Sequence, residues 1–370
     1  MNKPLRRVAP SIACFVAIRL LGLIALAVWA GARGKSAHTL LSARWDSLWY
    51  VRVIERGYDF KLRTADGRTL SDMAFFPLFP WLEKAFSTVF PLSPADAGLL
   101  VSAVASILAA AGIFFLVEGV YGARAALFTV ALWAALPVGI VQSMAYSESL
   151  FTALAVWGVY FAVKERWTAA GLLALFAGLT RPVGLAVAAA VWVAVAQKAY
   201  TSGRWNNKAL PGVVLAPLGF VAYFVWVGVR TDDLLGYLHV QNGWGNGFDG
   251  GVAFAGFIGD LLIHPPYITG VLLIAGVALL VWVYRRGFAK GYPLPLQVYT
   301  GLIVVLALCT SGFFGSKPRL LIPAFSVLMP AAAWLADRDR RRIVWTSILG
   351  VLIVGSALYG AFWLNGSGPP

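Results

Sequence analysis

An aspartate stands where a strongly apolar segment gives way to a polar one, beside residues that could take part in chemistry. Asp46 follows Arg44 and Trp45 in the stretch RWDSLWY, directly after an apolar run long enough to cross a bilayer. A carboxylate at a membrane boundary can act as a general base whose pKa is set by partial burial and a nearby arginine. The same carboxylate could instead complement the N-terminus of a helix over 47–56. The residues alone leave both interpretations open.

Three cationic side chains accompany prolines at the ends of apolar segments. Arg181 precedes Pro182 between two apolar segments of half length, and Lys317 and Arg319 flank Pro318. A guanidinium binds a phosphate through two parallel hydrogen bonds, so these side chains could hold the phosphate of a lipid. They could equally anchor the chain at lipid headgroups. We interpret Arg181, Lys317 and Arg319 as a phosphate-binding set.

Polar residues in three stretches could contact a sugar or an acceptor. Glu148 in YSESLF stands at a predicted helix start, where it could bind sugar hydroxyls or only complement the helix dipole. Gln241, Asn242 and Trp244 offer amides and an indole to a sugar, although a glycine-rich loop without a role would look the same. We add Arg44 and Trp45 to this sugar- and acceptor-binding set.

An aromatic block could contact a lipid tail. In FFPLFP, two prolines stiffen a non-helical ridge that carries Phe75, Phe76 and Phe79. The ridge could guide the tail of a lipid substrate, or it could simply pack at the membrane interface. We assign the three phenylalanines to lipid-tail contact.

The elements that must position these residues are membrane helices. The chain is 60% hydrophobic and 12% charged, and long apolar runs recur along it, which predicts an all-α polytopic membrane protein. Three runs, 146–163, 167–180 and 182–197, are short enough to be broken or half-crossing helices. We expect about eleven transmembrane helices, at 8–32, 95–117, 124–141, 146–163, 167–180, 182–197, 211–229, 266–284, 296–313, 319–336 and 343–363.

Charge asymmetry predicts the topology. The formal net charge is +14, and a cytoplasmic N-terminus places most of this excess in cytoplasmic segments, as the positive-inside rule requires. No nucleic acid is needed to explain it. The chain 1–370 then forms one integral membrane domain with two large extracytoplasmic loops, 33–94 and 230–265. The first should carry a surface helix around 44–56 and a hairpin turning at Asp66-Gly67.

The sequence lacks the motifs of several classes of function. The three histidines show no metal-ligand spacing, so we predict no metal and no cofactor, although a divalent cation could still assist. No Walker loop is present, which argues against a nucleotide-driven pump. Arg19, in the first span, is expected to serve the structure, for example by pairing with Glu118.

Four blocks in order resemble a known family. RWDSLWYVRVIERGYDF, MAFFPLFPWL, MAYSESLF and TRPVGL are similar to the motifs of the PIG-V family of membrane mannosyltransferases, which includes GPI mannosyltransferase II and bacterial relatives. The resemblance covers roughly residues 40–185, and the C-terminal half is similar mainly in layout. Nothing in the chain corresponds to a GPI-specific acceptor site.

The resemblance implies a GT-C fold with an active site at the outer face, built by the first external loop. It also implies transfer of a sugar, most often mannose, from a polyprenyl-phosphate donor with inversion, and it places the catalytic aspartate at Asp46. The acceptor would be a lipid or a glycan, the other partners would be membrane lipids, and the short loops indicate a bacterial plasma membrane. Two alternatives remain on the sequence: a flippase or transporter of a lipid-linked sugar, and a GT-C enzyme that uses another sugar.

Overall fold

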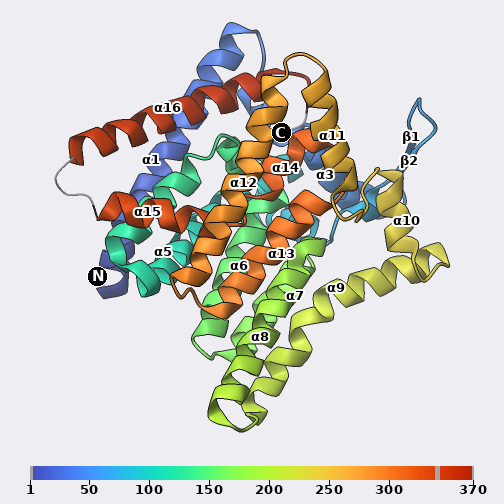
Figure 1. Cartoon of the computed structure of the whole chain (residues 1–370). Coiled ribbons are helices and arrows are strands. Elements are labelled where there is room, and N and C mark those ends of the chain that lie inside the picture. The colour runs from blue at the N-terminus through green and yellow to red at the C-terminus, as the bar shows by residue number, and fades with distance from the viewer. Residues whose placement is uncertain (1–2, 338–341, 369–370) are drawn as a thin grey trace.

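The computed structural model describes residues 3–337 and 342–368; part of the basic segment 337–342, predicted to be cytoplasmic, lies outside the described residues. The described chain is mainly α-helical, as predicted (Figure 1). The longer helices are α1 (Lys3–Ala32), α3 (Asp46–Arg56), α4 (Leu78–Val89), α5 (Pro94–Ala134), α6 (Ser147–Val163), α7 (Trp167–Gly178), α8 (Leu185–Ser202), α9 (Leu210–Thr231), α11 (Val252–Ile263), α12 (Ile268–Ala289), α13 (Leu294–Cys309) and α16 (Arg342–Asn365). The short helices are α2 (Ala37–Ser42), α10 (Gly236–Gly243), α14 (Lys317–Leu320) and α15 (Met329–Ala336), with 3-10 turns η1 (Asp72–Ala74), η2 (Gly139–Ser143), η3 (Pro182–Gly184), η4 (Asn207–Ala209), η5 (Phe314–Ser316) and η6 (Phe325–Leu328).

The first loop carries the two predicted elements. α3 falls where the surface helix was expected, and β1 (Lys61–Arg63) pairs antiparallel with β2 (Thr69–Ser71). Gly67 has φ 84° in the turn between the strands, a conformation that favours glycine. Both local predictions for this loop are confirmed.

Fewer helices than predicted are long enough to cross a bilayer by themselves. Among the described residues, six helices meet the length and composition needed for a span, or seven if a pair bent by 79° at 314–336 counts as one. Two predicted spans, 95–117 and 124–141, are merged in α5, whose backbone breaks at Gly122 with φ 81°. The segments expected at 146–163 and 167–180 form helices of 17 and 12 residues, which agrees with partial crossings.

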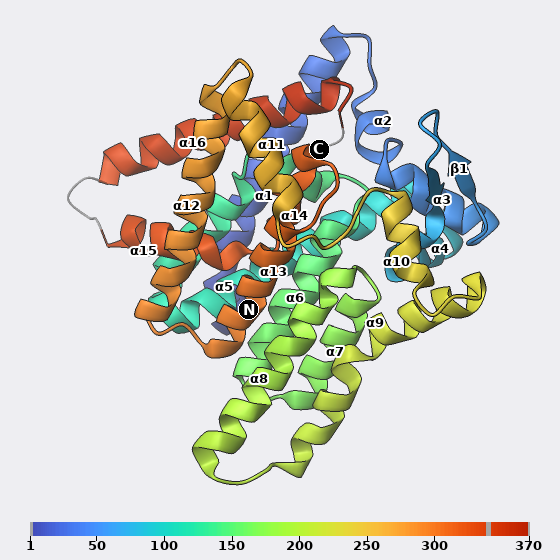
Figure 2. The same ribbon diagram turned by 45° about the vertical axis from the view of Figure 1, so that its right-hand side comes forward.

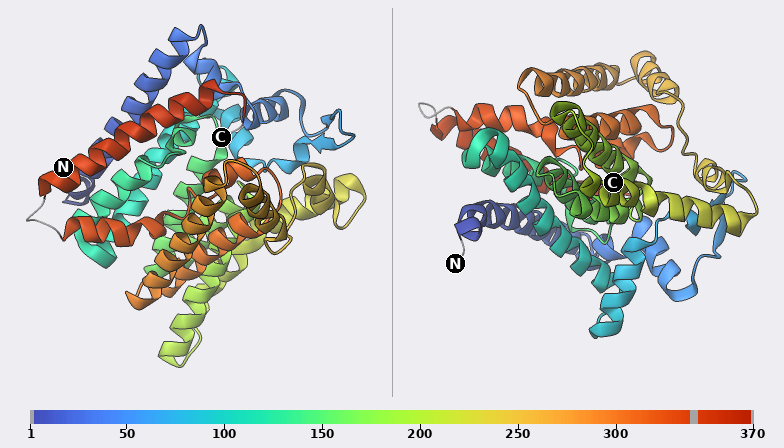
Figure 3. Two further views of the ribbon diagram at one scale, coloured as in Figure 1. Left: turned by 45° about the horizontal axis from the view of Figure 1, so that its top comes forward. Right: turned by 90° about the horizontal axis from the view of Figure 1, so that it is seen from below.

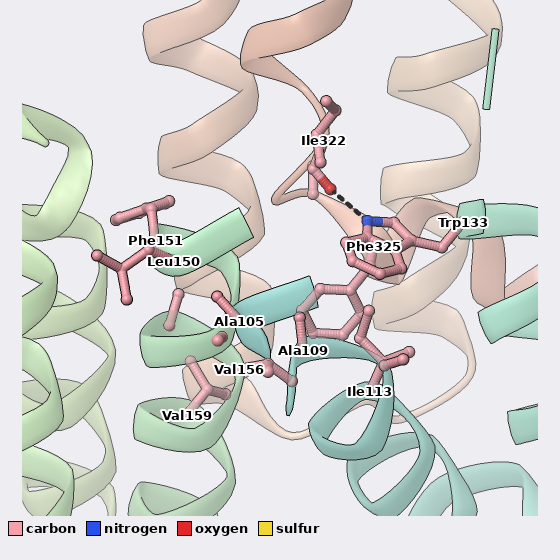
Figure 4. Close-up of a cluster of buried hydrophobic side chains, with 14 of the residues drawn as sticks. Ala105, Ala109, Ile113, Trp133, Leu150, Phe151, Val156, Val159, Ile322 and Phe325 are labelled. Atoms are coloured by element: carbon pink, nitrogen blue, oxygen red, sulfur yellow. Dashed lines mark hydrogen bonds between the residues drawn. The ribbon is translucent and has the colours of Figure 1, made fainter. Parts of the chain in front are cut away.

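Close packing of small residues holds the central helices together. α1 lies along α16 and α5, α6 packs on α5, and α7 packs on α9, as the views in Figures 2 and 3 show. Between α5 and α6, a Cβ added at Gly112 would lie 2.5 Å from Val156 Cγ1, so glycine permits this approach. Figure 4 shows the core beside this contact, where Trp133 donates through Nε1 to the carbonyl of Ile322 at 3.0 Å.

Arg19 serves the structure, but not through the expected partner. Its Nη1 donates to the carbonyl of Gly139 in η2. Glu118 is instead paired with Arg7, whose Nε donates to Oε1 at 2.9 Å. The pairing of Arg19 with Glu118 was therefore wrong, because Glu118 pairs with Arg7 and the buried guanidinium of Arg19 bonds to a backbone carbonyl of η2 instead.

The two segments predicted to be extracytoplasmic pack against one another. α3, the β1–β2 hairpin and α10 gather on one side of the molecule (Figure 1), and α10 contacts both β2 and η1. Trp244 Nε1 donates to the carbonyl of Ser71 at 2.9 Å, and Gln241 Nε2 donates to that of Ala74 at 3.2 Å. We call these two bonds and the surrounding ring contacts the loop clasp.

Candidate active site

Four charged side chains from distant parts of the chain meet at the ends of helices. Asp46 is the first residue of α3, and Glu148 lies in the first turn of α6. Arg181 stands between the end of α7 and η3, and Arg319 lies in the short helix α14. We call these four residues the charge cluster. Helix ends expose unpaired backbone groups and tolerate polar side chains, so several helix ends together can build a polar site within an apolar bundle.

Arg319 joins the two carboxylates of the charge cluster. Its Nη1 donates to Asp46 Oδ2 at 2.9 Å, and its Nε lies 3.2 Å from Glu148 Oε1. The same Glu148 oxygen lies 2.7 Å from Arg181 Nη1. Acidic and basic groups therefore alternate along the chain of contacts from Asp46 to Arg181. The guanidinium of Arg319 also lies 5.1 Å from the ring centre of Tyr146.

Hydroxyl groups support the Arg181 end of the charge cluster. Arg181 Nη1 donates to Ser147 Oγ at 3.1 Å, and Tyr50 donates its phenolic proton to the same oxygen at 2.9 Å. Burial, and next the carboxylates of Asp46 and Glu148, raise the pKa of Tyr50. The phenol thus stays neutral and remains a donor. α7 ends at Gly178, and Arg181, directly before Pro182, has an extended backbone.

A strained residue sets the start of α3. Trp45 has φ 50° and ψ −118°, a left-handed conformation that is rare for a bulky residue and costs about 1–3 kcal/mol. Arg44 stacks over the Trp45 ring at 3.8 Å and donates to the carbonyl of Leu364 at 2.7 Å. These contacts hold Trp45 and present Asp46 toward Arg319. In the structure, Arg44 joins the first loop to the end of α16 and lies outside the chain of ion pairs.

Burial of the charge cluster is difficult to explain as a stabilising device. The side chains of Asp46, Arg319, Arg181 and Glu148 are 22%, 11%, 17% and 2% exposed. The desolvation penalty of buried ion pairs often equals or exceeds their attraction, and apolar residues would stabilise a helical bundle at least as well. Partly buried, closely spaced charges of both signs are a mark of functional sites.

The structure does not bring Lys317 to the charge cluster. Its ammonium donates to the carbonyls of Ala307 at 2.7 Å and Thr310 at 2.6 Å, and it faces the rings of Phe254 and Phe314. These carbonyls lie at the end of α13. In this arrangement Lys317 completes a helix end, and Arg319 is the member of the pair that reaches the other charges.

The predicted sugar-binding residues of the second loop are mostly engaged in the loop clasp. Gln241 donates to Ala74 and to the hydroxyl of Tyr237, and Trp244 stands edge-on to Trp49 at 4.8 Å between ring centres. Asn242 is exposed. Only Asn242 of the three therefore has a side chain open to solvent, and the sugar-binding assignment of this loop remains a prediction.

The aromatic ridge lies inside the protein. Phe76 is 2% exposed and packs on Tyr223 at 4.4 Å between ring centres, while Phe79 has no exposed surface. Phe75 is half-buried and stacks on Trp49 at 5.6 Å. In this arrangement Phe76 and Phe79 have no free surface for a lipid tail, and Phe75 is the member of the ridge that retains one.

The sequence interpretation missed three residues that support the charge cluster. Tyr50 lies four residues after Asp46, a spacing that places both on one side of a helix, so its proximity was open to prediction. Tyr146 and Ser147 directly precede Glu148, yet nothing in their types indicated contacts with the first loop. Within residues 3–337 and 342–368, no group of three or more His, Cys, Asp and Glu side chains is placed to hold a metal ion.

Solved structures with the same fold identify the architecture of this bundle. The chain resembles ArnT from Cupriavidus metallidurans bound to undecaprenyl phosphate, with a TM-score of 0.56, 17% identity, and coverage of 95% of this chain and 75% of that one. It also resembles the apo oligosaccharyltransferase of Archaeoglobus fulgidus, with a TM-score of 0.53, 14% identity, and coverage of 96% and 55%. The fold is that of the GT-C membrane glycosyltransferases, as predicted.

A family model narrows this class. The model described as Mannosyltransferase (PIG-V) matches residues 32–225, which is more than half of the chain. The chain belongs to the PIG-V mannosyltransferase family, and it is an integral membrane mannosyltransferase. Comparison with curated protein sequences gave no match. Asp46, Glu148 and Arg181 lie within the matched segment, whereas Arg319 lies outside it.

Proposed function

We propose that this enzyme transfers mannose from a polyprenyl-phosphate-mannose donor to a lipid-linked or glycan acceptor on the extracytoplasmic face, with inversion at the anomeric carbon. The observation that carries the proposal is the contact of Asp46 with Arg319 at 2.9 Å, in a cluster that also holds Arg181. A carboxylate for the acceptor thus lies beside two guanidiniums for a phosphate. The structure of ArnT with undecaprenyl phosphate supports a polyprenyl-phosphate ligand for this fold.

In the proposed mechanism, Asp46 is the general base. It takes the proton of an acceptor hydroxyl while that oxygen forms a bond to the anomeric carbon. The bond from this carbon to the phosphate oxygen breaks on the opposite face, and polyprenyl phosphate leaves with the bonding electrons. The proton remains on the Asp46 carboxyl until it passes to water. General-base assistance of this kind contributes about 10²–10⁴-fold to the rate.

Arg181 and Arg319 stabilise the charge that develops on the leaving phosphate. Preorganised cations in a partly buried site act strongly on such a charge, because little water screens it. A phosphate needs no proton to leave, so the second carboxylate of the charge cluster, Glu148, need not act as a general acid. Arg319 contacts Asp46 in this structure, so a phosphate held by Arg319 would lie close to the base.

Transfer from labelled polyprenyl-phosphate-mannose tests the proposal, with purified protein in liposomes and a membrane lipid extract as acceptor. We expect transfer by the wild type and a loss of at least about 100-fold in Asp46→Asn. Asp59→Asn is the matched control, because Asp59 is an exposed acid of the same loop. Transfer that survives Asp46→Asn would remove Asp46 from the chemistry. Labelled lipid that crosses the liposome without any transfer would indicate a flippase, and transfer only from a donor with another sugar would exclude mannose.

A further inference from the structure

Glu148 has the least exposed side chain of the charge cluster, and both of its ion-pair partners are arginines. Its side chain is 2% exposed, compared with 22% for Asp46. Its Oε1 lies within 3.2 Å of Arg319 Nε and 2.7 Å of Arg181 Nη1. Oε1 thus faces both guanidiniums, and the other oxygen, Oε2, is buried without a hydrogen-bond partner in the described chain. Because the side chain has almost no exposed surface, the position is poorly suited to direct contact with a substrate.

The contacts of Glu148 fix the orientation of two guanidinium planes. Arg319 uses Nε for Glu148 and Nη1 for Asp46, so two edges of one planar group are held at once. Arg181 uses Nη1 for Glu148 and for Ser147 Oγ. A guanidinium carries five N–H donors in a fixed plane. The donors that remain free on each arginine therefore point in directions set by Glu148.

The negative charge of Glu148 also makes the arginine pair possible. Two guanidiniums that share one oxygen atom as partner repel each other, and the common carboxylate offsets this repulsion. Arg181 and Arg319 lie far apart in the sequence, directly before η3 and in α14. Glu148, in the first turn of α6, is the group that both contact.

We propose that Glu148 is a positioning residue that aligns Arg181 and Arg319 for the phosphate of a polyprenyl-phosphate lipid, and that it does not contact the sugar. The inference rests on the proposed function in one respect, namely that the arginines bind a lipid phosphate. It replaces the assignment of Glu148 to sugar binding. Bidentate recognition of a phosphate requires aligned donor pairs, so misaligned arginines bind any phosphate lipid less well, whether or not it carries a sugar.

Two lipid probes distinguish the possible roles of Glu148. Undecaprenyl phosphate carries no sugar, and undecaprenyl-phosphate-mannose carries one; the affinity of each is measured with the purified full chain in detergent. We expect Glu148→Gln to lower the affinity for both lipids by the same factor, of about tenfold or more. Glu148→Asp keeps the charge with a shorter reach, so it should recover part of the loss, again equally for both lipids.

Glu118→Gln is the matched control, because Glu118 is also a helical glutamate paired with an arginine and only 11% exposed, but it pairs with Arg7. It should leave both affinities unchanged. Weaker binding of the mannosylated lipid alone would show a sugar contact and overturn the inference, as would unchanged affinity for both lipids in a folded Glu148→Gln. If Glu148→Gln does not fold, Glu148→Asp is judged by the same comparison of the two lipids.

The outcomes for the proposed function remain separate. A wild type that binds both lipids but transfers no mannose would contradict the proposed function. The role of Glu148 would then still be decided by the measured lipid affinities. A wild type that binds neither lipid would overturn both.

Discussion

At the scale of single residues, the site depends on the shape of a guanidinium as much as on its charge. Arg319 contacts Asp46 through one nitrogen and Glu148 through another, at 2.9 and 3.2 Å. An ammonium is a point charge on a flexible stem, and it has no planar fork with which to hold two carboxylates in fixed directions. The geometry therefore requires arginine at this position.

Arg319→Lys should reduce kcat/KM by about tenfold or more, which corresponds to at least about 1.4 kcal/mol of transition-state stabilisation. The positive charge is kept, but its contacts with Asp46 and with a phosphate become less directional. The measurement is the initial rate of mannose transfer at several donor concentrations. Arg204→Lys, at an exposed position, should leave kcat/KM unchanged. Equal rates for Arg319→Lys and wild type would show that the fork has no role.

Only part of the candidate site could be predicted from the types of residues in the sequence. Asp46 and Arg181 could be found because each interrupts an apolar pattern beside a helix-breaking or helix-starting signal. The contact between Asp46 and Arg319 joins residues 273 positions apart, and no local pattern encodes a pairing of that length. Glu83 precedes Lys84 in the sequence, and adjacent charges of opposite sign give no local sign that one of them is buried. Its burial results from the packing of α4 on α5.

At the scale of elements, α4 and α5 pack around Glu83. The residue has no exposed surface, and neither carboxyl oxygen has a hydrogen-bond partner in the described chain. A Cβ added at Gly98 of α5 would clash with Glu83 Oε1 and would lie 3.0 Å from Ala145 Cβ. Gly98 thus permits α5 to lie close both to α4 and to Ala145, which directly precedes Tyr146 of the charge-cluster surroundings.

Gly98→Ala should destabilise the protein by about 1–3 kcal/mol, because the added methyl group must displace a buried carboxyl group. Gly119→Ala is the control on the same helix, where a Cβ would meet no atom within 4 Å. That change should be neutral or stabilising by up to about 1 kcal/mol, as alanine favours the helix. Thermal unfolding in detergent measures both. A Gly98→Ala variant as stable as Gly119→Ala would contradict the close contact.

Burial raises the pKa of the Glu83 carboxyl well above its usual range. The folded protein therefore holds this proton at pH values where the unfolded chain, with a pKa of about 4.3, has lost it. Stability from this group is present at low pH and declines as the pH rises toward the folded pKa. Glu83→Gln should remove that decline, seen as a smaller fall of the thermal midpoint between pH 5 and pH 8. Glu55→Gln, at an exposed position, should retain the wild-type fall; an equal fall in all three proteins would contradict a buried proton.

At the scale of the whole molecule, hydropathy predicted the class of fold, but it did not predict where helices merge or how the loops contact one another. The apolar runs indicated a helical membrane protein. Two of these runs, however, lie in the single helix α5, because the chain kinks at Gly122 and the helix resumes directly after it. The loop clasp could not be predicted, because the indole of Trp244 bonds to a backbone carbonyl, and every residue offers such a group. The clasp joins the first loop to the segment around α10, beside the first turn of α3, where Asp46 lies.

Loss of the loop clasp should therefore expose the hairpin 61–71, whose Lys61, Arg63 and Arg68 are exposed cleavage sites for trypsin. Trp244→Ala removes the Nε1 bond to Ser71 and the ring contact with Trp49, and a cost of about 1.4 kcal/mol in local opening makes cleavage about tenfold faster. Trp244→Phe keeps a ring but loses the donor, so its rate should be intermediate. Trp205→Ala, at an exposed tryptophan outside the clasp, should leave the rate unchanged. If the hairpin of Trp244→Ala is cut no faster than wild type, the clasp does not hold the first loop, and the position of Asp46 depends on its other contacts, such as that with Arg319.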